Sequence, residues 1–130
     1  MTSPRTGPVI SAMLVPWLLA ACENRPAVRT EFDPGPVPAE LAEGERLYQK
    51  NCARCHGPQG VGSGVGPPLI HIVYEPNHHG DMAFQRASKF GVPAHHWTFG
   101  NMPPIPEVDE AGVARITAYV RWLQRAAGIQ

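Results

Sequence analysis

The chain has 130 residues, the length of one ordinary domain, and contains 15 prolines, 13 glycines and three cysteines. Eleven basic and eleven acidic side chains cancel, so charge gives no indication of a surface for nucleic acid or another polyanion, and we expect no nucleic-acid partner. Three cysteines do not complete a disulfide framework, and two of them, Cys52 and Cys55, lie too close together to close a loop of useful length.

Residues 1–21 have the features of a signal peptide. One positive charge, at Arg5, precedes an apolar run from Val9 to Ala21. The run is interrupted by Pro16 and is shorter than the roughly 20 apolar residues that a membrane-spanning helix needs. We therefore predict that this segment is removed and that the mature protein is extracytoplasmic.

The end of the signal peptide, Leu19-Ala20-Ala21-Cys22, resembles the lipobox of bacterial lipoproteins. The resemblance implies cleavage before Cys22 and diacylglycerol on its thiol, which would anchor the protein to a bacterial membrane on the periplasmic side. Each buried methylene of the acyl chains would contribute about 0.8 kcal/mol to anchoring. The alternative is an ordinary secretory signal that leaves Cys22 as a free thiol. Residues 22–38 are rich in proline and without period, and they are predicted to form an extended tether.

Two segments of the following domain, residues 39–130, are predicted to be helices. The first runs from Ala39 to Gln49 and has its acidic side chains early, where the helix dipole favours them. The second begins with Asp81 as its N-cap and stops at Gly91.

A third predicted helix starts near Asp109 and closes at Gly128. Its apolar residues recur at spacings of three and four, at Val113, Ile116, Val120 and Leu123. No alternating strand pattern is present, so the fold class is predicted to be all-α, with long loops over 57–68 and 92–108. A domain of about 90 residues is marginally stable without a staple or cofactor. We expect a buried cofactor to organise these loops.

The most informative stretch is Cys52-Ala53-Arg54-Cys55-His56, a CxxCH sequence typical of covalent haem attachment. The two thiols of such a motif add to the vinyl groups of one porphyrin, and the adjacent histidine reaches the iron. Three alternatives remain: a thioredoxin-like redox pair, which expects a βαβ setting that is not predicted; a zinc site completed by His78-His79 or His95-His96; and a local disulfide.

Residues 39–130 resemble the class I (monohaem) cytochromes c. The segment from Gly44 to Cys52 is similar to the first helix of that family, and the segment from Ile116 to Val120 is similar to its last helix. The resemblance implies that Gly44 allows the two helix backbones to approach closely, and that Tyr48 packs near Ile116 and Tyr119. It also implies a cytochrome c-like fold, with three main helices and long loops wrapped around one covalently bound haem c.

Two loop segments extend the resemblance to the iron ligands. Gly66-Pro67-Pro68-Leu69 is similar to a family segment in which the proline carbonyl accepts a hydrogen bond from the ligating histidine, so Pro67 would orient His56. The alternative is a proline turn without ligand contact. Asn101-Met102-Pro103-Pro104 is similar to the segment that supplies the sixth ligand, which makes Met102 that ligand and His56 the fifth. Met82, the other methionine that survives signal removal, is predicted to be an apolar filler.

Several residues near the predicted site lack an assigned role. Trp97 is a candidate hydrogen-bond donor to a haem propionate, because a buried indole N–H needs a partner. Five histidines exceed what a minimal cytochrome needs: His71, His78, His79, His95 and His96. We expect them to be solvated or linked to propionates. An axial-ligand role and a second metal site, including copper at the paired histidines, remain open.

Together these features predict a membrane-tethered, extracytoplasmic carrier of single electrons that is not itself an enzyme. Its cofactor would be one covalent haem c with iron, and its partners a redox donor and a redox acceptor. One alternative is a haem enzyme in which Met102 is labile. Another is a module that senses or traffics haem, metal or a small ligand.

Overall fold

A computed structural model describes residues 32–130. The predicted signal peptide, Cys22 and the start of the predicted tether lie outside these residues. Within them the structure is helical and contains no strand element, so the all-α prediction is confirmed. Backbone pairing of the strand type occurs only as one isolated antiparallel bridge, between Val92 and Met102. No helix of residues 32–130 combines the length and the hydrophobicity that crossing a bilayer requires.

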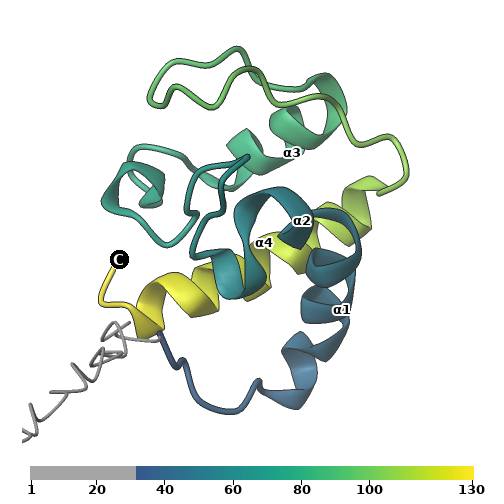
Figure 1. Ribbon diagram of the computed structural model, residues 1–130. Coiled ribbons are helices and arrows are strands. Elements are labelled where there is room, and N and C mark those ends of the chain that lie inside the picture. Colours follow the sequence, from purple (N-terminus) through teal and green to yellow (C-terminus); the bar gives the residue numbers. More distant parts are fainter. Residues whose placement is uncertain (1–31) are drawn as a thin grey trace, which may run out of the picture. The chain divides into compact units, whose positions relative to one another are not determined.

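The described chain forms four α-helices and three short 3-10 helices (Figure 1). In chain order they are η1 (Ala39–Leu41), α1 (Ala42–Asn51), α2 (Ala53–His56), η2 (Pro58–Gly60), η3 (Ile72–Tyr74), α3 (Asp81–Phe90) and α4 (Glu110–Ala126). The three predicted helices correspond to η1 with α1, to α3 and to α4. The short helix α2 and the 3-10 turns were not predicted.

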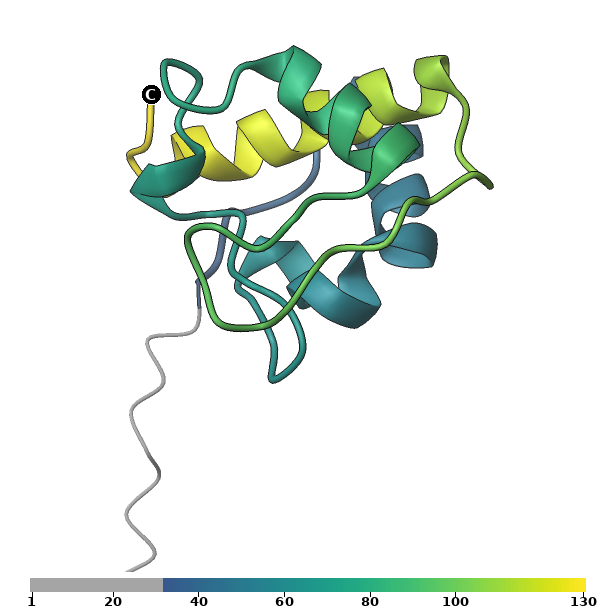
Figure 2. The same ribbon diagram turned by 90° about the horizontal axis from the view of Figure 1, so that it is seen from above.

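The two helices α1 and α4 cross in close contact (Figures 1 and 2). A side chain at Gly44 would overlap the backbone carbonyl group of Arg115, so only glycine fits at this crossing. The ring of Tyr48, one turn further along α1, lies against the ring of Tyr119, with the two centroids 5.5 Å apart. This packing agrees with the expected contact between the first and last helices.

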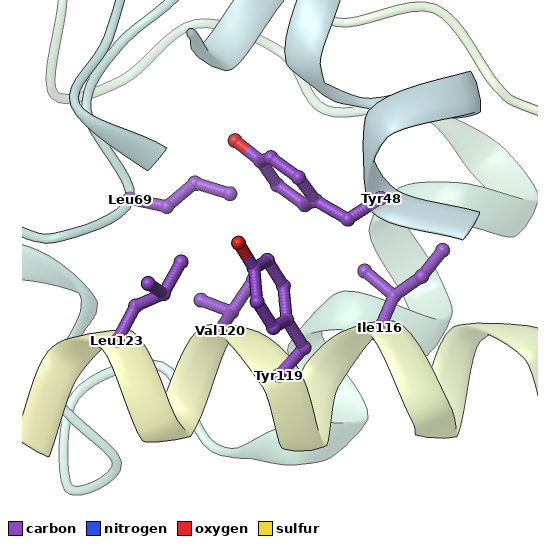
Figure 3. Packing of buried hydrophobic residues seen from close by; sticks show 6 residues of the cluster. All are labelled: Tyr48, Leu69, Ile116, Tyr119, Val120 and Leu123. Atoms are coloured by element: carbon purple, nitrogen blue, oxygen red, sulfur yellow. The ribbon is translucent and has the colours of Figure 1, made fainter. Parts of the chain in front are cut away.

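The hydrophobic core lies along this crossing (Figure 3). Its buried members are Tyr48, Leu69, Ile116, Tyr119, Val120 and Leu123. Phe32 and Val37 also pack against the core. The prediction of an extended tether up to residue 38 is therefore wrong for these last residues, because their apolar side chains are drawn into the folded domain.

Three polar side chains on α4 are buried, and two of them, Arg121 and Gln124, bond to other segments of the chain. Gln124 donates hydrogen bonds to the carbonyl oxygens of Leu69 (2.8 Å) and Tyr74 (3.0 Å). Arg121 donates to the carbonyl oxygens of Tyr74 (2.8 Å) and His79, and its Nε donates to the Asp81 carboxylate (2.9 Å). These bonds tie the chain between Leu69 and Asp81 to α4, since each buried polar group needs a partner.

The helices α3 and α4 start and end close to the predicted residues, and only the N-cap of α3 differs from its prediction, by one residue. The helix α4 starts next to Asp109, as predicted, and the Asp109 carboxylate caps it by accepting a hydrogen bond from the Gly112 amide (2.7 Å). Gly91 ends α3 with φ of +74°. The N-cap of α3, however, is Gly80, and Asp81 is the first helical residue because its carboxylate is engaged by Arg121. Met82 is 62% exposed, so its prediction as an apolar filler is wrong.

Replacing Gly44 by alanine is expected to lower the free energy of unfolding by about 1–3 kcal/mol, because the added methyl group meets backbone atoms that cannot rotate away. Urea denaturation of the purified protein measures the change. Gly64→Ala is the matched control, since a Cβ there has no atom within 4 Å. An equal effect of both substitutions would contradict the close approach of the two helices as the cause.

Candidate functional site

The CxxCH sequence forms a compact turn between α1 and η2. Cys52 ends α1, where its amide donates to the carbonyl of Tyr48 (2.8 Å). Cys52 also precedes α2, where the His56 amide donates to the Cys52 carbonyl (2.9 Å). The chain then reverses at Gly57, which has φ of +76° and lies against the backbone of Gly62. Glycine is favoured at such a φ because it carries no Cβ. The hydroxyl group of Tyr48 donates to the Gly57 carbonyl (2.8 Å), so the core holds the turn in place.

A mainly apolar cavity of about 370 Å³ opens beside this turn. Its wall is contributed by α2, the segment around Pro67, α3, the loop between α3 and α4, and one face of α4. The cavity brings together five of the residues predicted from the sequence: Cys52, His56, Pro67, Trp97 and Met102. Cys55 is half-buried on α2 but is not among the residues that line the cavity.

The imidazole of His56 is fixed by a single backbone acceptor. Its Nδ1 lies 2.9 Å from the carbonyl oxygen of Pro67. Because a carbonyl only accepts hydrogen bonds, Nδ1 carries the proton and Nε2 keeps its lone pair. Burial lowers the pKa of His56, an effect opposed by the bond to Pro67. His56 is thus a neutral imidazole with one free ring nitrogen, the form in which histidine binds metals.

Met102 reaches the cavity from a loop that is closed by backbone hydrogen bonds. Its amide and carbonyl pair with the carbonyl and amide of Val92, both at 2.9 Å. The side chain of Asn101 accepts from the Ala94 amide (2.9 Å), and the Ile105 amide donates to the Ser88 carbonyl (2.7 Å). The thioether is therefore carried by a constrained segment. The bridge between Val92 and Met102 was not predicted, because two isolated residues produce no repeating pattern in the sequence.

Trp97 presents an unpaired donor to the same cavity. Its ring packs edge-on against His71, with the centroids 5.0 Å apart, and is tilted against Phe99. Its indole Nε1 is buried and lies near the Tyr74 hydroxyl, but it forms no hydrogen bond of good geometry among the described residues. A buried indole N–H without a partner is costly. It therefore fits an occupant of the cavity that carries a polar acceptor.

The thiols of Cys52 and Cys55 are free, and that of Cys52 is not activated. Burial, followed by the charge of Cys55, raises the pKa of Cys52 to about 11. Redox-active CxxC pairs have lowered pKa values, so this environment argues against a thioredoxin-like function. Zinc binding by the cysteines together with a histidine pair is not favoured either. In the described part of the chain, the one group of potential metal ligands consists of His78, His79 and His96 and includes neither cysteine.

Comparison with known proteins gives one match. Residues 41–124, more than half of the chain, match the model of the family described as cytochrome c. Neither the curated proteins nor the solved structures contain a match. Proteins of the matching family bind covalent haem c with its iron.

The residues at the cavity fit that cofactor. Two free thiols precede a histidine with one free ring nitrogen, the lining is mainly apolar, and the buried Trp97 N–H could donate to a polar acceptor in the cavity. Cys52 and Cys55 would hold the porphyrin covalently, and His56 would offer Nε2 to the iron. Trp97 is in place to donate to a propionate, as predicted from the sequence. These individual roles remain predictions.

The substitution Trp97→Phe removes the indole N–H donor and keeps an aromatic ring at this position. If the N–H pairs with the cofactor, the substitution should cost the haem-loaded protein about 1–2 kcal/mol of unfolding free energy. If the N–H is unpaired, its removal should be neutral or slightly stabilising. Denaturant unfolding followed by absorption measures the sign. Trp122→Phe is the control for the smaller ring, because Trp122 packs on Tyr119 and does not line the cavity.

Proposed function

The chain belongs to the cytochrome c family and is an electron-transfer haem protein with haem c and redox partners. Within this family, we propose that it is a monohaem carrier of the class I type. Histidine and methionine would ligate the iron, and a lipid would tether the protein on the extracytoplasmic side of a bacterial membrane. The observation that carries the ligand assignment is that His56 and Met102 line one cavity. His56 directly follows Cys55, the second of the two free thiols.

Each side chain has a defined part in this function. The haem, when bound, supplies a one-electron Fe(III)/Fe(II) couple. His56 holds the iron through Nε2, and the Pro67 carbonyl keeps its ring in the required tautomer and orientation. Met102 offers a soft, neutral thioether, which favours the ferrous state and raises the reduction potential. The apolar lining limits the access of water.

A filled sixth position distinguishes a carrier from a haem enzyme. An enzyme acting on peroxide or another small ligand needs an open or labile site at the iron. The paired backbone of Met102 and the closure of its loop at Ser88 restrict the movement of the thioether. This restraint supports the carrier over the enzyme, because ligands that stay in place in both oxidation states keep the reorganisation on electron transfer small.

Substitution of Met102 by alanine tests the ligand set. The ferric variant should lose the weak far-red absorption band of a sulfur–iron bond. The reduced variant should bind carbon monoxide readily, and its reduction potential should fall by on the order of 0.1 V. Met82→Ala, an exposed methionine on α3, is the matched control and should retain the band. A wild-type protein that lacks the band and binds carbon monoxide would contradict the carrier function.

Membrane tethering is tested at Cys22, which lies outside the described residues. Cys22→Ser removes the thiol that would take diacylglycerol, so the protein should move from the membrane fraction to the soluble extracytoplasmic fraction. Its intact mass should also lack the acyl chains that the wild-type protein carries. Equal membrane association of wild type and variant, or an unmodified wild-type mass, would contradict a lipid anchor while leaving the haem chemistry untouched.

A further inference from the structure

Three histidines from two separate segments meet outside the predicted iron ligands. His78 and His79 lie in the turn between η3 and α3, and His96 lies in the loop between α3 and α4. One ring nitrogen of each lies within 4.8 Å of the others. The two Nε2 atoms of His78 and His96 are only 3.3 Å apart. The sequence offered the histidines as pairs, whereas the fold groups them as a trio.

The turn that carries His78 and His79 is held in place by the protein interior. The amides of both residues donate to the Glu75 carbonyl, at 3.1 and 2.8 Å. The buried guanidinium of Arg121 donates to the carbonyl of His79, at the end of the turn, and to that of Tyr74, at its start. A group of ligands on a restrained backbone loses little conformational entropy when it binds an ion.

The ring of His79 already has the orientation of a metal-binding histidine. Its Nδ1 lies 2.6 Å from the carbonyl oxygen of Val73, so Nδ1 carries the proton and Nε2 is free. Metal-ligating histidines commonly donate their second ring N–H to such an acceptor, which fixes the tautomer. The same arrangement orients His56 through Pro67. The Asp81 carboxylate nearby in sequence is bound to Arg121, so the trio offers imidazole nitrogen alone.

We propose that His78, His79 and His96 form a second metal site, which binds one divalent copper or zinc ion through three imidazoles. Imidazole suits both ions, and copper binds nitrogen ligands more tightly than zinc. Two nitrogens that share a tetrahedral ion at 2.0–2.1 Å lie about 3.3 Å apart, the separation of the His78 and His96 nitrogens. Three protein ligands leave one position for water or an exchanging ligand.

The place of this site connects it to the haem protein. His79 and His96 also line the cavity that holds the predicted iron ligands, whereas His78 is exposed. An ion bound by the trio would therefore sit between solvent and the wall of the cavity. The ion-binding chemistry does not depend on which residue is the sixth iron ligand, so the site extends beyond the carrier function.

Isothermal titration of the untagged, haem-loaded protein with Cu(II), and separately with Zn(II), tests the site. We expect one ion per chain, with copper the tighter, and nitrogen hyperfine structure in the electron paramagnetic resonance spectrum of the Cu(II) form. The double variant H78A/H96A should bind at least tenfold more weakly. Both side chains are exposed, so the variant should fold, and an unchanged far-ultraviolet circular dichroism spectrum verifies this.

His71→Gln is the matched control, because His71 lies outside the trio and does not line the cavity. It should bind both ions as the wild type does. Binding of either ion that is lost in H78A/H96A and kept in H71Q supports the site. No binding above buffer, or equal binding by wild type and H78A/H96A, overturns it and leaves the histidines as solvated or propionate-linked residues. The far-red band reports separately on Met102, so failure of this site is distinguishable from failure of the carrier function.

Discussion

The close approach of α1 and α4 at Gly44 is the constraint on which the remaining structure depends. Because Gly44 has no side chain, Tyr48 is brought against Tyr119 and can donate from its hydroxyl to the Gly57 carbonyl. That bond holds the turn after α2. The position of this turn allows the His56 ring to bond to the Pro67 carbonyl. A local steric requirement in one helix crossing thus reaches the imidazole that offers a free nitrogen to the cavity.

A second set of contacts organises the other side of the domain from α4. Arg121 and Gln124 are buried and donate hydrogen bonds to backbone carbonyls between Leu69 and His79, and Arg121 also donates to the Asp81 carboxylate. Loops rich in proline and glycine have few partners of their own, so buried side chains from a helix satisfy them. The segment between Leu69 and Asp81 is therefore held from within the protein by α4.

The proposed iron site and the proposed copper or zinc site each contain a histidine that is oriented by a backbone carbonyl. His56 and His79 each point a ring Nδ1 at a backbone carbonyl, at 2.9 and 2.6 Å. In both cases the acceptor fixes the tautomer and leaves Nε2 available for a metal. Two ligands of the proposed copper or zinc site, His79 and His96, line the same cavity as the proposed iron ligands His56 and Met102. The two proposals together describe an electron-transfer protein with a second metal site beside its haem cavity.

The sequence by itself determined the helical class and the positions of the three main helices, because these rest on local spacing. Its motifs resembled those of one family, and that resemblance implied the crossing at Gly44. It also identified His56 and Pro67 as partners through resemblance to the family. It did not determine the burial of Arg121 and Gln124, since a charged or polar residue on a helix reads as solvated until its distant acceptors are known. The exposure of Met82, the packing of Phe32 and Val37, the bridge between Val92 and Met102, and the grouping of His96 with His78 and His79 were likewise decided only by the tertiary structure. Each of these depends on contacts between segments that are far apart in the chain, for which a single sequence carries no periodic signal.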